Sequence, residues 1–89
     1  MSKKTVVITG ASSGIGLGLA KAFLDNDYNV VGSARSTDGL KEAANSLGNP
    51  DNFVGVAGDV ADPSTARDLF AVAIERFGSV DVLVNNAGF

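Results

Sequence analysis

A glycine-rich segment between an apolar run and an amphipathic run is the feature that most constrains the fold of this chain. Residues 5–9 are apolar or β-branched without strict alternation, which is typical of a strand covered on both faces of a parallel sheet. Over residues 14–26 the apolar side chains recur at helical spacing. A strand, a tight loop and a helix are therefore expected in succession, and the side chains expected on the buried stripe of the helix are Ile15, Leu19, Ala20, Phe23 and Leu24.

The alternation of strand-like and helix-like segments continues. A second strand is expected over residues 29–33 and a helix over 37–47, which Gly48 and Pro50 stop. The side chains of this helix expected to point inward are Leu40, Ala43, Ala44 and Leu47.

A third strand is expected over residues 53–57 and a fourth over 80–84. Between them Asp62 offers a capping oxygen and Pro63 a preset φ, so a helix is expected from Pro63 to residue 77, closed by Gly78. The side chains expected on its buried face are Ala66, Leu69, Phe70, Ala73, Ile74 and Phe77.

Strands that alternate with helices at this spacing predict right-handed crossovers and a parallel sheet. The expected fold class is α/β, a partial Rossmann or doubly wound fold whose four strands lie in the order 3-2-1-4 with flanking helices. We expect residues 1–89 to form a single unit. In such sheets ligands bind at the carboxyl ends of the strands, beside the point where the strand order reverses.

The three glycines of the first loop suit an anion site. Gly10 can take a tight turn, Gly14 lets the backbone approach a diphosphate and Gly16 permits close helix packing, while the helix N-terminus supplies unpaired N–H groups. An ordinary glycine-rich turn is the alternative. A phosphate-loop NTPase is excluded, because Leu17 and Gly18 follow Gly16 where that motif needs Lys and Ser or Thr.

Three motifs at successive strand ends resemble those of the short-chain dehydrogenases/reductases. They are Thr-Gly-x-x-x-Gly-x-Gly over residues 9–16, Gly-Asp-Val over 58–60 and Asn-Asn-Ala-Gly over 85–88. The resemblance covers essentially the whole chain and implies the N-terminal, cofactor-binding half of an oxidoreductase that transfers a hydride between a nicotinamide cofactor and a carbonyl or alcohol. The loop residues that it assigns to the cofactor are Gly10, Ser12, Ser13, Gly14, Ile15 and Gly16.

The same resemblance gives roles to residues after the third and fourth strands. It implies that Asp59 and Val60 flank the adenine ring, and that Asn85 braces the sheet. It implies that the adenosine ribose is lined by Asn86, Ala87 and Gly88. Asp59 could instead be a solvated turn residue, and the two asparagines could merely satisfy backbone groups at the strand end.

The end of the second strand indicates NADP rather than NAD. An acid there would bond the ribose hydroxyls of NAD, whereas an Arg accommodates the 2′-phosphate of NADP. Ala34 takes the place of the acid, and Arg35 and Ser36 follow. Ser13 lies where NADP-using relatives often carry a second basic residue, so selection would depend mainly on Arg35. An exposed Arg35 without a ligand is the alternative. A methyltransferase is disfavoured, because it too usually needs an acid at this strand end.

The family's catalytic Ser, Tyr and Lys have no counterpart here. Tyr28 is the chain's single tyrosine, and it precedes the second strand, so a packing or surface role is expected. Histidine and cysteine are absent, which leaves no alternative base or nucleophile and no metal site. We expect no catalytic residue among the 89 and interpret them as a fragment of a longer enzyme. The alternative is a nucleotide-binding or self-assembling module without turnover.

Charge and hydrophobic patterning limit the kinds of partner expected for the chain. The net charge is −3, and only Lys3 and Lys4 are adjacent basic residues, so no nucleic-acid partner is expected. Residues 5–8 are too few for a signal peptide or a membrane span, so we expect no membrane partner and a cytoplasmic location. The fourth strand would have an open apolar edge, which predicts self-association through residues 80–84.

Overall fold

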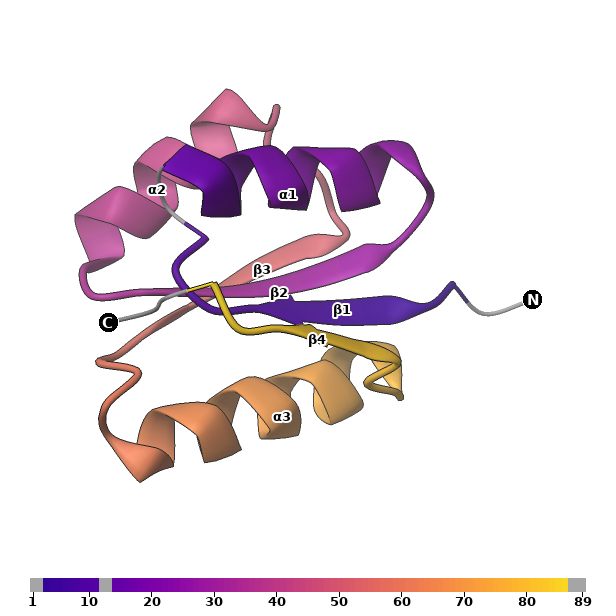
Figure 1. Ribbon diagram of the computed structural model, residues 1–89. Helices are drawn as coiled ribbons and strands as arrows, with labels where there is room; N and C mark the ends of the chain where they lie inside the picture. The colour runs from indigo at the N-terminus through magenta and orange to yellow at the C-terminus, as the bar shows by residue number, and fades with distance from the viewer. Residues whose placement is uncertain (1–2, 12–13, 87–89) are drawn as a thin grey trace.

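The computed structural model describes residues 3–11 and 14–86. Their strands form one parallel sheet in the order β3-β2-β1-β4 (Figure 1), as predicted. The elements in chain order are β1 (Thr5–Ile8), α1 (Gly14–Asp25), β2 (Asn29–Ala34), α2 (Thr37–Ser46), β3 (Phe53–Ala57), α3 (Pro63–Phe77) and β4 (Val82–Val84). The doubly wound α/β fold is therefore confirmed, with element ends within two residues of those predicted.

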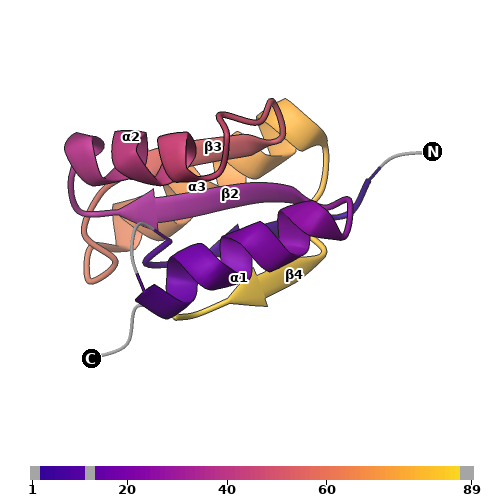
Figure 2. The same cartoon turned by 90° about the horizontal axis from the view of Figure 1, so that it is seen from above.

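Helices cover both faces of the sheet. α1 and α2 lie on one face and α3 lies on the other (Figure 1). Figure 2, seen from above, shows α1 running along the sheet between β2 and β4, and its main contacts with the sheet are to β1 and β2. In the central register Val7 pairs with Val31 of β2 and with Leu83 of β4. All four strands point the same way, so their carboxyl ends meet at one edge.

The core has two halves that β1 separates. On the α1 side the buried cluster comprises Val6, Ile8, Ala11, Ala20 and Val30. On the α3 side it comprises Val7, Val31, Leu69 and Ala73. Alternate residues of β1 point to opposite faces, and every residue of this strand is buried. This double burial explains why its sequence is apolar without a polar face.

Both ends of α3 have the predicted caps. The Asp62 carboxylate accepts a hydrogen bond from the backbone N–H of Ser64 at 2.9 Å, and Gly78 ends the helix in the left-handed conformation with φ 84°. The bonds from the backbone N–H and then the hydroxyl of Ser64 hold the pKa of Asp62 below its ordinary value. The helix boundaries thus follow from residues that the sequence shows directly.

Several side chains predicted to be buried are exposed. Phe70 is 38% exposed and Ile74 55% exposed, and Ala66 on the same side of α3 is also exposed. The reason is that α3 packs mainly over β1, β2 and β3, so its side toward β4 is only partly covered. Ile15 is 75% exposed, because the adjacent Gly16 is the residue that turns toward the protein.

The strand β4 is shorter than the predicted segment 80–84. Val80 packs against the core as a partly buried side chain, but regular pairing begins only at Val82. The Asp81 carboxylate accepts the backbone N–H of Thr5 at 2.8 Å, while the Asp81 N–H donates to the Thr5 carbonyl at 2.8 Å. A side chain therefore takes the place of a strand carbonyl at this end of the sheet.

Candidate cofactor site

The candidate site lies at the carboxyl edge of the sheet. Gly10 follows β1, Arg35 follows β2, Asp59 follows β3 and Asn86 follows β4. The parallel arrangement thus brings together residues from four segments that are far apart in the sequence (Figure 1). Ser12, Ser13, Ala87 and Gly88, which the sequence also assigned to the cofactor, lie outside the described residues.

Gly10 is held by bonds to Ser33 of β2 and to Asn86, which follows β4. Its N–H donates to the Ser33 hydroxyl oxygen at 3.2 Å, and its carbonyl accepts the Asn86 Nδ2 amide at 3.3 Å. Its φ of 67° is one that glycine adopts readily. A Cβ on Gly16 would collide with the Gly10 carbonyl. The first glycine therefore makes the turn, and the third lets α1 pack directly onto it.

The start of α1 is the part of the loop that is open. Gly14 has φ 57°, is exposed, and a Cβ built on it would meet nothing within 4 Å. The protein therefore leaves space above Gly14, and backbone N–H groups at a helix start have no intrahelical acceptor. This combination suits the approach of an anion such as the diphosphate of a dinucleotide.

Arg35 and Ser36 mark the end of β2. Both are exposed, and no ion pair is formed by Arg35 within residues 3–11 and 14–86. The Ser36 hydroxyl oxygen accepts the backbone N–H of Gly39 at 3.0 Å, which caps α2. Its hydroxyl hydrogen stays available as a donor. A guanidinium, a hydroxyl and a helix start side by side fit a phosphate group.

Asp59 and Val60 form the turn between β3 and α3. One Asp59 carboxylate oxygen accepts the backbone N–H of Ala61 at 2.9 Å, so Asp59 has a turn role while its side chain stays exposed. The turn lies close on α3, because a Cβ on Gly58 would come within 2.6 Å of the Thr65 hydroxyl oxygen. Thr65 is buried. The sequence motifs did not point to Thr65. The signal that could have found it is the small residue Gly58 before the Asp59-Val60 pair, because a glycine there lets another side chain lie close.

The end of β4 is joined to the end of β1 by Thr9. The Thr9 hydroxyl lies 3.1 Å from Asn85 Oδ1 and accepts the Asn86 backbone N–H at 2.9 Å. Asn85 thus has the bracing contact that the sequence suggested. The Asn86 side chain also braces the strand ends, because its Nδ2 donates to the Gly10 carbonyl. The sequence did not suggest this contact. Its expected contact with the ribose stays a prediction.

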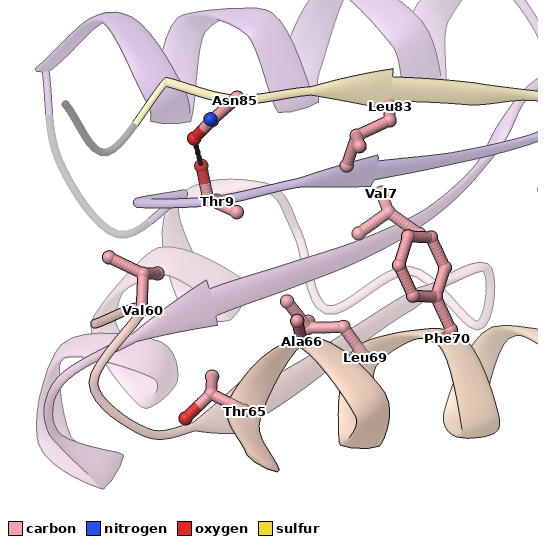
Figure 3. A pocket seen from close by; sticks show the side chains of 9 residues that line it. All are labelled: Val7, Thr9, Val60, Thr65, Ala66, Leu69, Phe70, Leu83 and Asn85. Carbon is pink, nitrogen blue, oxygen red and sulfur yellow. Dashed lines mark hydrogen bonds between the residues drawn. The ribbon is translucent and has the colours of Figure 1, made fainter. Parts of the chain in front are cut away.

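An apolar pocket lies between α3 and β4, beside this edge (Figure 3). Val7 and Leu83 from the sheet face Leu69 and Phe70 from α3. The hydrogen-bonded pair of Thr9 and Asn85 forms its polar end. The other residues that line it are Val60, Thr65 and Ala66.

Residues 3–11 and 14–86 contain neither a metal-binding cluster nor a helix that could cross a membrane. No group of three His, Cys, Asp or Glu side chains there could hold a metal ion. Among the helices of those residues, none combines the length and apolar character that a bilayer crossing requires.

The fold is that of a doubly wound α/β protein, and its glycine loop, helix start and polar strand ends converge at the edge where such folds bind ligands. The family model of the short chain dehydrogenases matches residues 4–89. The chain therefore belongs to the short-chain dehydrogenase family, as its three motifs indicated.

Known relatives support this assignment. An L-rhamnose 1-dehydrogenase (NAD(P)(+)) from Sphingomonas is 43% identical, over 96% of this chain and 34% of that protein. A probable NADP-dependent dehydrogenase from Haemophilus influenzae is 38% identical, over 99% of this chain and 34% of its own length. This chain thus spans about one third of the length of these relatives.

Two solved structures of similar proteins superpose on the whole of this chain. L-sorbose reductase from Gluconobacter frateurii, in complex with NADPH and L-sorbose, superposes with a TM-score of 0.87 at 43% identity, covering 100% of this chain and 35% of that one. An actinorhodin polyketide ketoreductase with NADPH gives a TM-score of 0.89 at 35% identity, covering 100% of this chain and 36% of that one.

Proposed function

We propose that this chain is the NADP(H)-binding portion of an oxidoreductase that transfers a hydride between a nicotinamide cofactor and a carbonyl or alcohol. The observation that carries the proposal is Arg35, an exposed guanidinium directly after β2, at the edge where the glycine loop opens. A free guanidinium fork matches a phosphate dianion, whereas Ala34 offers no acid for the ribose hydroxyls of NAD. When bound, NADPH supplies the hydride.

The residues present fit the diphosphate and the adenine end of the dinucleotide. Open space above Gly14 suits the diphosphate, and Asp59 keeps one carboxylate oxygen for the adenine end. The names of three similar proteins support the cofactor, since the relative from Haemophilus influenzae is described as NADP-dependent and the two reductase structures contain NADPH. NADP is therefore proposed ahead of NAD.

We further propose that the 89 residues alone bind the cofactor without turnover. Tyr28 is the only tyrosine of the chain, and it packs edge-on against Phe23 with the ring centroids 4.9 Å apart. It precedes β2, at the opposite end of the strand from Arg35. Tyr28 is thus a packing residue, as predicted, and is remote from the candidate site.

The partners proposed are the dinucleotide and a second copy of the chain. β4 pairs with β1 on one side, and Leu83 in its centre is 55% exposed. An edge strand with an apolar side chain invites pairing with another strand. Self-association through β4 is therefore proposed for the 89-residue chain.

Titration of the chain with NADPH and NADH, followed by cofactor fluorescence, tests the proposed function. We expect NADPH to bind more tightly by roughly ten- to hundredfold, since hydrogen bonds to a charged group contribute about 1.5–3 kcal/mol. Arg35→Asp should abolish this preference, and Arg67→Asp, which makes the same charge change on the exposed surface of α3, should keep it. An unchanged NADPH-to-NADH ratio in Arg35→Asp would refute the selection, and no binding of either cofactor would refute the function.

Turnover is measured in the same samples with a model carbonyl and NADPH. Binding without turnover agrees with the proposal. Measurable turnover by the 89 residues would contradict the absence of catalytic residues, and self-assembly without any cofactor binding would favour the alternative of a non-catalytic assembly module.

A further inference from the structure

Ser33 is a buried polar residue that the sequence-based site does not include. It lies in β2 between apolar or small neighbours, and its exposed fraction is 0%. It makes two contacts with the glycine loop. Its hydroxyl oxygen accepts the Gly10 N–H at 3.2 Å, and its backbone carbonyl accepts the Ala11 N–H at 2.8 Å. One residue of β2 therefore binds two consecutive amides of the loop.

Within residues 3–11 and 14–86 the Ser33 hydroxyl is the acceptor that the structure gives to the Gly10 N–H. Ala11 is fully buried and lies against β2 so closely that a Cβ on Gly32 would come within 2.5 Å of the Ala11 Cβ. Without the Ser33 oxygen, the part-buried Gly10 N–H would lose the acceptor that the structure gives it. Loss of this bond removes what one ordinary hydrogen bond contributes to holding the loop.

The bonds divide the loop into a fixed part and an open part. Both backbone polar groups of Gly10 are engaged, by Ser33 and by Asn86. The Gly10 N–H therefore points to β2 and is not a donor to a ligand. The open part is the helix start at Gly14, three positions after Ala11. The two parts are in direct contact, because Gly16 in the first turn of α1 packs against the Gly10 carbonyl so closely that a Cβ would collide with it.

We propose that Ser33 is a positioning residue of the cofactor site: its hydroxyl and carbonyl fix Gly10 and Ala11 and thereby aim the amides at the start of α1 at the diphosphate. This inference is based on the proposed NADP(H) function. Ser33 contacts the loop and not the adenosine end, which belongs to Arg35 and Asp59. Removal of its hydroxyl should therefore weaken only ligands that carry the diphosphate.

Two ligands distinguish the diphosphate end of the site from the adenosine end. NADPH carries the diphosphate, and adenosine 2′-monophosphate carries the 2′-phosphate without it. In Ser33→Ala we expect the Kd for NADPH to rise about three- to tenfold, the loss of one ordinary hydrogen bond, and the Kd for adenosine 2′-monophosphate to stay within about twofold. Ser33→Thr, which keeps the hydroxyl, should restore NADPH affinity. A merely structural role would weaken both probes equally, and that result would overturn the proposal.

Amide hydrogen exchange followed by NMR tests the bond itself and does not require a foldable variant. In the unmodified chain the Gly10 amide should be protected although it lies in a turn. In Ser33→Ala its exchange should accelerate, while the Val31 amide in the middle of β2 keeps its rate. A Gly10 amide that exchanges at the rate of a free amide in the unmodified chain would overturn the proposal, even if Ser33→Ala fails to fold.

The same data separate this inference from the proposed function. If the unmodified chain binds neither probe, the proposed function fails. If it binds both and Ser33→Ala binds NADPH with unchanged affinity, the function stands and the role of Ser33 is refuted.

Discussion

The backbone of Gly16 lies directly against the carbonyl of Gly10, with no room for a Cβ between them. Asn86 Nδ2 donates to the same carbonyl, so the loop after β1, the first turn of α1 and the end of β4 meet at one oxygen atom. The packing of α1 and the shape of the candidate site therefore depend on the same contact.

Gly16→Ala should destabilise the chain. The added methyl collides with the Gly10 carbonyl and comes within 2.8 Å of Asn86 Nδ2, so α1 or the loop must move. Overpacking of this kind costs about 1–3 kcal/mol, which urea unfolding measures directly. A matched control is Gly18→Ala, two residues along the same helix, where the new Cβ meets nothing within 4 Å.

The control should change stability in the opposite direction. Alanine is favoured over glycine inside a helix by about 0.5–1 kcal/mol, so Gly18→Ala should stabilise the chain by that amount. If the two variants shifted the unfolding midpoint equally, close packing at Gly16 would be refuted.

Acidic pH should lower the stability of the fold, because the carboxylates of Asp81 and Asp62 lose their charge. The backbone N–H of Thr5 and then the Ser79 hydroxyl hold the pKa of Asp81 below its ordinary value of 3.8, and Ser64 does the same to Asp62. The unfolded chain then binds protons more readily than the folded one. The stabilisation is fully present above about pH 4 and is lost as the pH falls through the lower folded pKa.

Thermal unfolding between neutral pH and strongly acidic pH measures this loss. Asp81→Asn should lower the midpoint at neutral pH and flatten its decline in acid. Asp68→Asn, whose carboxylate has no hydrogen bond within residues 3–11 and 14–86, should leave the profile parallel to that of the unmodified chain. Parallel profiles for all three proteins would show that Asp81 does not contribute.

Leu83→Lys should reduce self-association. A lysine in the centre of β4 adds a charge to the edge strand and removes an apolar side chain that is 55% exposed. Sedimentation velocity at increasing concentration should show the unmodified chain forming dimers or larger species and Leu83→Lys remaining smaller. Ile15→Lys replaces an even more exposed apolar residue on the opposite layer and serves as the control. A monomeric unmodified chain at high concentration would refute the proposed edge contact.

Local signals in the sequence predicted most of the fold. The Asp62-Pro63 start and the Gly78 end place α3, and the apolar β-branched run places β1. Helical spacing alone failed for Phe70 and Ile74, because it gives the apolar side of a helix but not how far the sheet extends beneath it. α3 packs mainly against β1, β2 and β3, so part of its apolar side is only partly covered.

The site was predictable only in its outline. Motif positions brought Gly10, Asp59 and Asn86 to one edge, since parallel strands end together. Their hydrogen-bond partners depend on tertiary contacts, and Ser33 is the clearest example: in the sequence it is one small residue in a strand. A polar side chain near the carboxyl end of an otherwise apolar strand is the signal that would have found it.

Chemical-shift mapping with NADPH tests the central claim most directly. Addition of NADPH to the labelled chain should shift the amides at the carboxyl edge, at Gly14, Arg35 and Asp59 above all, and leave Tyr28 at the opposite end of β2 unchanged. Shifts centred on Tyr28, or no shifts at saturating NADPH, would contradict the assignment of this edge as an NADP(H) site.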